Sequence, residues 1–207
     1  MAPWPVLIGA VLAGGLIFAV RAHRDERVIR ELAGDAKRVD AGPPDRTTEE
    51  TCVSRSNPRI LLACAVLYLN LAAREAPGPG RDAALLAALR FSERLQGEQP
   101  GSGEASVLRS LAAAQLGREH EAMVALQESY RRAPYLRDFA LARIALAARS
   151  ASHLDPVTRR TMLTEAIWLG RLGRRQRLAV LDALAGTDSY ITVSLRLPGS
   201  PVAERPL

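Results

Sequence analysis

The chain has 207 residues, of which 48% are hydrophobic, 24% charged and only 4% aromatic. The apolar share excludes a wholly disordered chain, and the scarcity of aromatic and β-branched residues argues against a β-sandwich or barrel. Ala and Leu, with 35 and 30 copies, are strong helix formers, so the composition predicts an all-α fold. The net charge is +6, but no DNA-binding motif accompanies it, and we expect no nucleic-acid partner.

The first twenty residues contain no charged side chain. Residues 4–20 are long and apolar enough to cross a bilayer, with Trp4 suited to one interface and Arg21 and Arg24 following as a polar stop. No basic residue precedes the apolar run, as a cleaved signal peptide would require. We therefore expect residues 1–24 to form a single-pass transmembrane anchor.

Small residues four positions apart in this segment would let two transmembrane helices pack closely, although Gly and Ala are also common in membrane spans in general. The candidates for such packing are Gly9, Ala10, Ala13, Gly14, Gly15 and Ala19. Four arginines follow the span between residues 21 and 30, so the positive-inside rule predicts that the remaining domain is cytoplasmic. The periplasmic side is the alternative.

Helical patterns begin directly after the anchor. Residues 25–38 carry an apolar stripe that includes Val28, Ile29 and Leu32, while the polar, proline-containing residues 40–57 are typical of a linker. Residues 25–55 are therefore expected to be a juxtamembrane helix and a linker that separates it from the domain. Two further apolar helices are predicted over residues 59–74 and 82–95, joined by a loop.

Residues 106–116 and 119–132 predict a pair of short helices parted by Gly117. Gly117, Ala122 and Pro134 stand at the spacing that allows a tight turn, close helix approach and a helix stop. This pair resembles a tetratricopeptide (TPR) unit, although its first helix departs from the family pattern. The resemblance implies an array of antiparallel helix pairs that presents a concave binding surface.

The helical rhythm continues over residues 135–149, 156–172 and 174–185. Asp155 is a predicted N-cap, followed by Pro156 at the first helical position. The segment after Asp188 reads either as a final helix or as a short strand. Residues 56–195 are therefore expected to form the TPR-like domain, and residues 196–207 a disordered tail.

The region from Pro134 onward also resembles the helical repeat regions that accompany bacterial exopolysaccharide and O-antigen ligase machinery. The residues that carry this resemblance are Pro134-Tyr135, Leu154-Asp155-Pro156 and Arg159-Arg160. It implies a role in surface polysaccharide biosynthesis or export, with the anchor in the bacterial inner membrane. It brings no catalytic residues with it.

The sequence contains no catalytic motif. The three histidines show no metal-ligand spacing, and Glu165 reads as an ordinary helix carboxylate. We therefore predict no catalytic residue, no cofactor, no metal site and no enzymatic activity.

Cys52 and Cys64 are the only cysteines. They could pair outside the cytoplasm, whereas a reducing cytoplasm would keep them apart as thiols. The apolar neighbours of Cys64 favour a buried structural thiol. The cytoplasmic topology predicted above therefore implies two thiols.

The densest basic patch comprises Arg171, Arg174, Arg175 and Arg177. This patch could bind an acidic partner or anionic lipid. Alternatively, it is a solvated helix end, where arginines are favoured by the helix dipole.

These features together predict an adaptor or scaffold: a membrane-anchored helical array that binds a protein partner. The alternatives are an envelope structural protein and a subunit of a glycan-processing enzyme. Tyr and Arg are enriched at binding hot spots, which places the partner-binding candidates in the pair of helices around residue 130. They are Tyr130, Arg131, Arg132, Tyr135 and Arg137, although either tyrosine could instead belong to the core.

Overall fold

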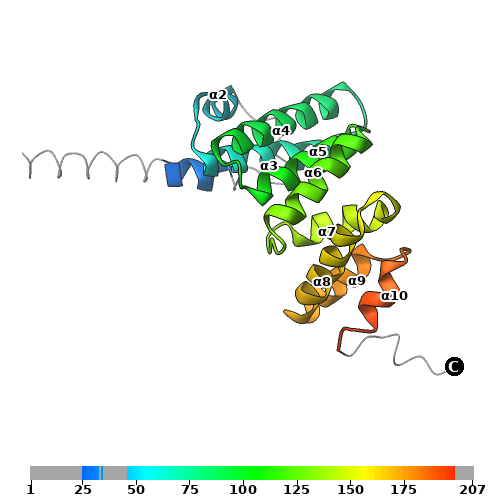
Figure 1. Ribbon diagram of the computed structural model, residues 1–207. Coiled ribbons are helices and arrows are strands. Elements are labelled where there is room, and N and C mark those ends of the chain that lie inside the picture. Colours follow the sequence, from blue (N-terminus) through cyan, green and yellow to red (C-terminus); the bar gives the residue numbers. More distant parts are fainter. Residues whose placement is uncertain (1–24, 33, 35–45, 199–207) are drawn as a thin grey trace, which may run out of the picture.

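The computed structural model describes residues 25–32, residue 34 and residues 46–198, and these form helices and their connections without a strand (Figure 1). A helical segment over residues 25–32 comes first. The helices that follow are α2 (Arg46–Ser54), α3 (Pro58–Arg74), α4 (Pro79–Glu98), α5 (Gly103–Gln115), α6 (Glu119–Arg132), α7 (Ala140–Arg149), the 3-10 turn η1 (Ala151–His153), α8 (Pro156–Arg171), α9 (Arg174–Ala183) and α10 (Ser189–Ser194).

Consecutive helices pack as neighbours from α2 to α6 and again from α7 to α10, most closely α3 with α4 and α5 with α6. In addition, α3 contacts α5, α5 contacts α7, and α7 contacts α9, while α6 contacts α8 and α8 contacts α10. Contacts between a helix and the next helix but one are what stacked helix pairs produce. Figure 1 shows α2–α6 gathered in one group and α7–α10 in a second group beside it.

Two apolar clusters fill the interior. The first joins the segment 25–32 with α2–α5 and includes Ile60, Leu85 and Leu108. The second joins α6–α10 and includes Leu126 and Met162. Burial of each such side chain contributes about 1.5–3 kcal/mol to the stability of the fold. Because the two clusters share no buried residue, each half of the molecule has a core of its own.

The membrane-anchored part of the predicted fold class is not supported. The expected span at residues 4–20, with its packing candidates Gly9 to Ala19, lies outside the described residues. Among the residues that the structure does describe, no helix is both long and apolar enough to cross a bilayer. The longest, α4, has 20 residues but carries six charged side chains, and α3 has only 17 residues. The predicted fold class is therefore corrected to an all-helical fold without the single-pass anchor. The inner-membrane localisation, which depended on that anchor, is not supported either.

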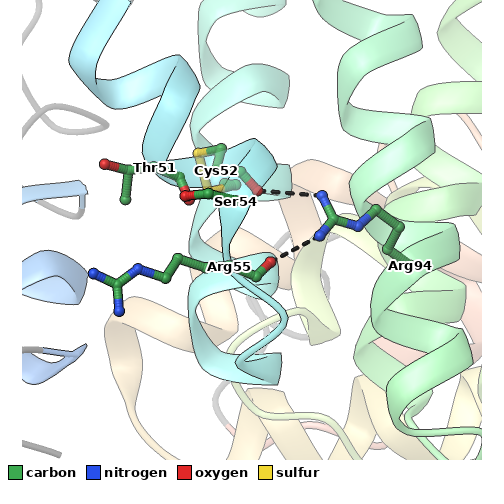
Figure 2. Close-up of a disulfide and its surroundings, with 6 residues drawn as sticks. Thr51, Cys52, Ser54, Arg55 and Arg94 are labelled. Atoms are coloured by element: carbon green, nitrogen blue, oxygen red, sulfur yellow. Dashed lines mark hydrogen bonds between the residues drawn. A yellow bond between two sulfur atoms is a disulfide. The ribbon is translucent and has the colours of Figure 1, made fainter. Parts of the chain in front are cut away.

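The stretch predicted as a linker contains helix α2, which two long-range contacts hold in place. Cys52 on α2 forms a disulfide with Cys64 on α3, and both side chains are fully buried. Arg94 on α4 donates through Nη1 to the carbonyl of Cys52 at 3.3 Å and through Nη2 to that of Arg55 at 2.8 Å (Figure 2). The expectation of two separate thiols is therefore wrong, because the two sulfur atoms are joined in a disulfide.

The segment 25–32 belongs to the first core and is not held apart from it. Leu32 is buried in that cluster, and Val28 and Ile29 pack against it. Its first residue, Asp25, accepts a hydrogen bond at 2.7 Å from the side chain of Asn57, the N-cap of α3. The apolar stripe was predicted, but its burial against the domain was not.

The turn between α5 and α6 follows the prediction. Gly117 has φ +72°, a left-handed conformation that strains residues with a Cβ. Its N–H donates to the carbonyl of Ala114 at 3.1 Å, and that of Arg118 donates to Ala113 at 2.9 Å. These two bonds form a Schellman motif, which ends α5 and lets α6 fold back along it.

Candidate functional site

A groove of about 1040 Å³ lies between the α5–α6 pair and α7. Its floor is mainly apolar and is rich in alanine, with Leu111, Ala114, Met123, Ala142, Ala145 and Leu146 among the lining residues. Polar side chains surround this floor, among them Gln115, Glu119, His120, Gln127, Arg149 and His153. We refer to this surface as the α6–α7 groove.

The groove exists because α7 is apolar on two sides. Ile144 and Ala147 are fully buried on its inner side, in the second core. Ala142 and Ala145 are on the other side and line the groove, where their short side chains leave open volume between the helices. On the facing helix α6, Val124 is an exposed large apolar side chain.

A buried ion pair holds α7 in place on the side that faces away from the groove. Arg143 on α7 donates through Nε to Oε2 of Glu165 on α8 at 2.8 Å, and its Nη2 also contacts Oε1 of the same carboxylate; neither side chain is exposed. The guanidinium donates further to the carbonyls of Ala133 at 2.7 Å and Pro134 at 2.9 Å. Glu165 in turn accepts from the backbone N–H of Leu136 at 3.0 Å.

This network explains why α7 begins at Ala140 and not near residue 135 as predicted. Residues 133–139 pass over the buried pair, and their backbone groups bind Arg143 and Glu165 instead of forming helical hydrogen bonds. Because all of these charges are paired and shielded from water, the network has a positioning role.

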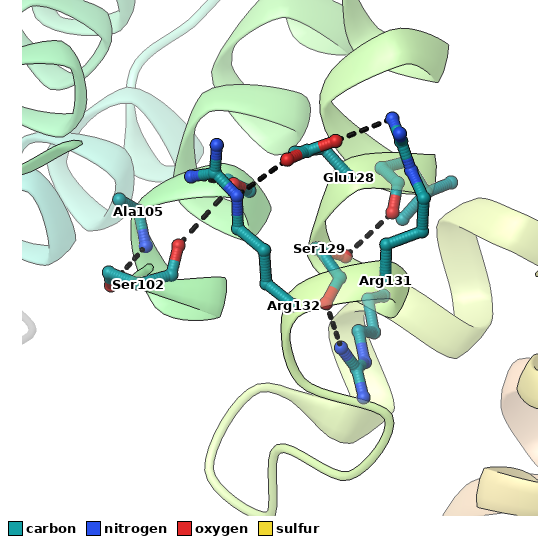
Figure 3. Close-up of polar contacts among 9 residues, drawn as sticks. Ser102, Ala105, Glu128, Ser129, Arg131 and Arg132 are labelled. Carbon is teal, nitrogen blue, oxygen red and sulfur yellow. Dashed lines mark hydrogen bonds and ion pairs between the residues drawn. The ribbon is translucent and has the colours of Figure 1, made fainter. Parts of the chain in front are cut away.

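The five predicted partner-binding residues do not form one surface, and none of them lines the groove. Arg131 and Arg132 are both paired with Glu128, which lies between them in Figure 3, and Arg132 Nε is 2.6 Å from Glu128 Oε1. Arg131 is exposed, whereas Arg132 is partly buried and also reaches the hydroxyl of Ser106 on α5 at 3.5 Å. Arg132 therefore helps to join α5 to α6.

Tyr130 is a core residue. Its ring lies 4.2 Å from the guanidinium carbon of Arg143, a cation–π contact. Burial raises the pKa of Tyr130 well above its ordinary value, the Glu165 carboxylate raises the pKa further, and Arg143 opposes both effects. The hydroxyl group is buried and has no hydrogen-bond partner of acceptable geometry among the described residues.

Tyr135 and Arg137 lie on the exposed loop before α7. The Tyr135 ring packs against Trp168 of α8, with the ring centroids 5.3 Å apart. These two residues are accessible to a partner. Their role in partner binding stays a prediction.

The groove was not predicted from the sequence. The predicted binding residues were Tyr and Arg, whereas the groove is lined mainly by alanine and other aliphatic side chains. One pattern could have revealed it. The α7 sequence ALARIALAAR has apolar residues around most of the helix, which predicts packing on more than one side.

No group of three side chains that could hold a metal ion occurs in the described part of the chain. Comparisons of the chain with family models, with curated proteins and with solved structures find no match. The resemblance to TPR units, and the polysaccharide role implied by the second resemblance, therefore stay predictions.

Proposed function

We propose that this protein is a helical adaptor that binds an apolar helical segment of a partner protein in the α6–α7 groove. The observation that carries the proposal is the groove itself, a concave surface with an apolar floor and a polar border. Amphipathic helices bind such grooves with a row of apolar anchors while their polar side faces water.

The size and openness of the groove favour a protein segment over a small molecule. At about 1040 Å³ it is at the upper limit of small-molecule cavities, which are usually roughly 300–1,000 Å³ and bury most of their ligand. Here Val124, Ala142 and Arg149 are exposed, so a bound molecule would keep one side in water. The alanines of the floor allow the close approach of another helix, and Met123 adapts to different side chains.

A selection with amphipathic peptides tests the proposal. The full chain is used to select binders from a phage-displayed library of helical peptides about 18 residues long. We expect selected peptides with apolar residues at helical spacing (i, i+3 or i+4, i+7) and micromolar dissociation constants. Ala142→Glu, which places a charge on the groove floor at an already exposed position, should weaken their binding by about tenfold or more.

The matched control is Ala83→Glu, which makes the same change at an exposed alanine of α4 outside the groove. It should leave the affinity unchanged, and both variants should show the circular dichroism spectrum of the unmodified chain. Selected peptides that bind equally well to Ala142→Glu would show that the groove is not the binding site and would refute the proposal.

A further inference from the structure

Positive charge is distributed unevenly along the described chain. Residues 46–132 contain eleven arginines and ten acidic residues, a net charge of +1, whereas residues 133–198 contain ten arginines and five acidic residues, a net charge of +5. Several arginines of the first half are paired with carboxylates, as Arg59 is with Glu26 at 2.9 Å and Arg109 is with Glu121 at 3.1 Å. The surplus therefore lies in the second half.

Of the ten arginines in residues 133–198, five lie beyond the middle of α8. They belong to the C-terminal end of α8, to α9 and to the residue that follows Leu195, a region that we call the C-terminal corner (residues 171–198). Its arginines are Arg171, Arg174, Arg175, Arg177 and Arg196, against two acidic residues, Asp182 and Asp188. Within the described residues none of the five has an ion-pair or side-chain hydrogen-bond partner, and Nε of Arg177 is buried without one.

The same corner exposes large apolar side chains. Ile191 and Leu195 are 64% and 71% exposed, and Leu172 and Leu178 are also exposed. These residues belong to elements that pack together, since α8, α9 and α10 contact one another in every combination. Leu178 follows Arg174 by four residues, so these two side chains are neighbours on the same face of α9.

The exposed pair Ile191 and Leu195, on α10 and directly after it, is a fixed feature of the fold. On the inner side of this segment Val193 and Leu197 are buried in the second core. Leu197 approaches α8 so closely that a Cβ at Gly170 would lie 2.8 Å from both of its methyl carbons. With the inner side held in this way, Ile191 and Leu195 face outward in the folded protein.

We propose that the C-terminal corner binds an acidic amphipathic helix of a partner protein. Carboxylates of that helix would lie against the unpaired arginines, and its apolar residues would cover Leu178, Ile191 and Leu195. Arginine suits this role because its planar guanidinium binds carboxylates through two parallel hydrogen bonds. The inference goes beyond the proposed function, since it gives the adaptor a second surface that is separate from the groove.

Charge distinguishes this partner from other occupants. A second copy of the chain would bring another corner of net charge +3 against the first, which is repulsive. An anionic bilayer or a nucleic acid presents negative charge throughout, and would therefore also face Asp182 and Asp188. A protein helix can place its carboxylates opposite the arginines and neutral groups opposite these two aspartates.

The test uses the full chain and a fluorescein-labelled 18-residue amphipathic peptide, with Leu on one side and Glu on the other, in fluorescence anisotropy. The expected result is saturable binding that weakens as salt is added. Reversing two charges with Arg174→Glu/Arg175→Glu should weaken binding by about tenfold or more, and Ile191→Ser/Leu195→Ser by about fivefold or more.

The matched control is Arg90→Glu/Arg160→Glu, which changes the net charge equally at two exposed arginines outside the corner. It should leave the affinity within about twofold. The proposal is overturned if this control weakens binding as much as the corner variant, or if a peptide with Gln in place of Glu binds equally well. It is also overturned if vesicles of phosphatidylglycerol or a 20-mer duplex DNA bind through Arg174 and Arg175 while the peptide does not. Ala142→Glu should not affect this binding, so failure of the groove proposal and failure of this one are distinguishable.

Discussion

The core formed by α2–α5 and the core formed by α6–α10 are held together by different chemistry. In the first, the Cys52–Cys64 disulfide attaches α2 to an otherwise apolar interior. In the second, the Arg143–Glu165 ion pair is fully buried among apolar side chains and organises the loop before α7. A covalent link acts mainly by restricting the unfolded chain, whereas a buried pair fixes the geometry of the folded one. The groove wall depends on the second kind of support.

Breaking the buried pair should have the largest effect. Glu165→Gln leaves the guanidinium of Arg143 buried without a compensating charge, so we expect a loss of about 3–5 kcal/mol in the free energy of unfolding. Urea unfolding followed by circular dichroism measures this loss. Glu31→Gln, the same change in the exposed Arg27–Glu31 pair, is the control and should cost no more than about 0.5 kcal/mol. Equal effects of the two substitutions would contradict the positioning role.

Removing the disulfide should have the next largest effect, and it should be confined to the first core. The two cysteines are 12 residues apart, and a loop of that length corresponds to about 2–4 kcal/mol. Hydrogen exchange of Cys52→Ala/Cys64→Ala should show faster exchange in α2 and unchanged exchange in α8. Increased exchange in α8 as well would mean that the two cores unfold as one unit.

The N-cap of α8 gives a smaller effect that depends on pH. Asp155 accepts hydrogen bonds from the Thr158 hydroxyl at 2.6 Å and from the backbone N–H groups of Val157 and Thr158, and these bonds lower its pKa. Because the pKa is lowered on folding, the ionised carboxylate stabilises the folded state at every pH above the ordinary pKa of an aspartate. This stabilisation is lost as the pH falls through the lower pKa that Asp155 has in the folded protein. Asp155→Ala should therefore cost about 1 kcal/mol at pH 7, and much less once the pH has fallen below the lowered pKa of Asp155.

Asp155→Asn separates the charge from the cap. Asn is nearly as good an N-cap as Asp but does not titrate, so this variant should keep most of the stability at pH 7 and lack the pH-dependent part. If Asp155→Asn destabilises as much as Asp155→Ala, the carboxylate charge matters more than the cap geometry.

Removing the Tyr130 hydroxyl should have the smallest effect. Because this group is buried without a hydrogen-bond partner, Tyr130→Phe takes away a polar atom that gains nothing from folding and keeps the ring against Arg143. The melting temperature should be unchanged or slightly raised. A fall of several degrees would reveal a hydrogen bond from this hydroxyl to Glu165 in solution.

Local patterns in the sequence predicted the parts of the fold that depend on local contacts. The Gly117 turn and the Asp155–Pro156 start of α8 both occur as predicted. Helix α2 was missed because its attachment depends on Cys64 and Arg94, which are distant in sequence. The same reason applies to Glu165, whose partner Arg143 is 22 residues away and becomes a neighbour only when α7 packs on α8.

The candidate site was less predictable than the fold. Tyr130 and Arg132 have side chains typical of binding hot spots, but one is in the core and the other helps to join α5 to α6. Nothing in a single helix distinguishes an alanine that packs on a neighbour from one that borders open volume, such as Ala145. The basic patch that begins at Arg171 was visible in the sequence, whereas its exposed apolar neighbours required the structure.

Burial of the Cys52–Cys64 disulfide has a consequence for the rate at which it can be reduced. A thiolate must reach one of the two sulfur atoms, and neither cysteine is exposed to solvent. Reduction therefore waits for local opening of α2, and its rate reports how often that opening occurs. A molecule that was oxidised while folding keeps α2 attached for some time after it enters reducing surroundings. A molecule that was never oxidised lacks this covalent attachment from the start, so the state of α2 depends on the molecule's history as well as on its present environment.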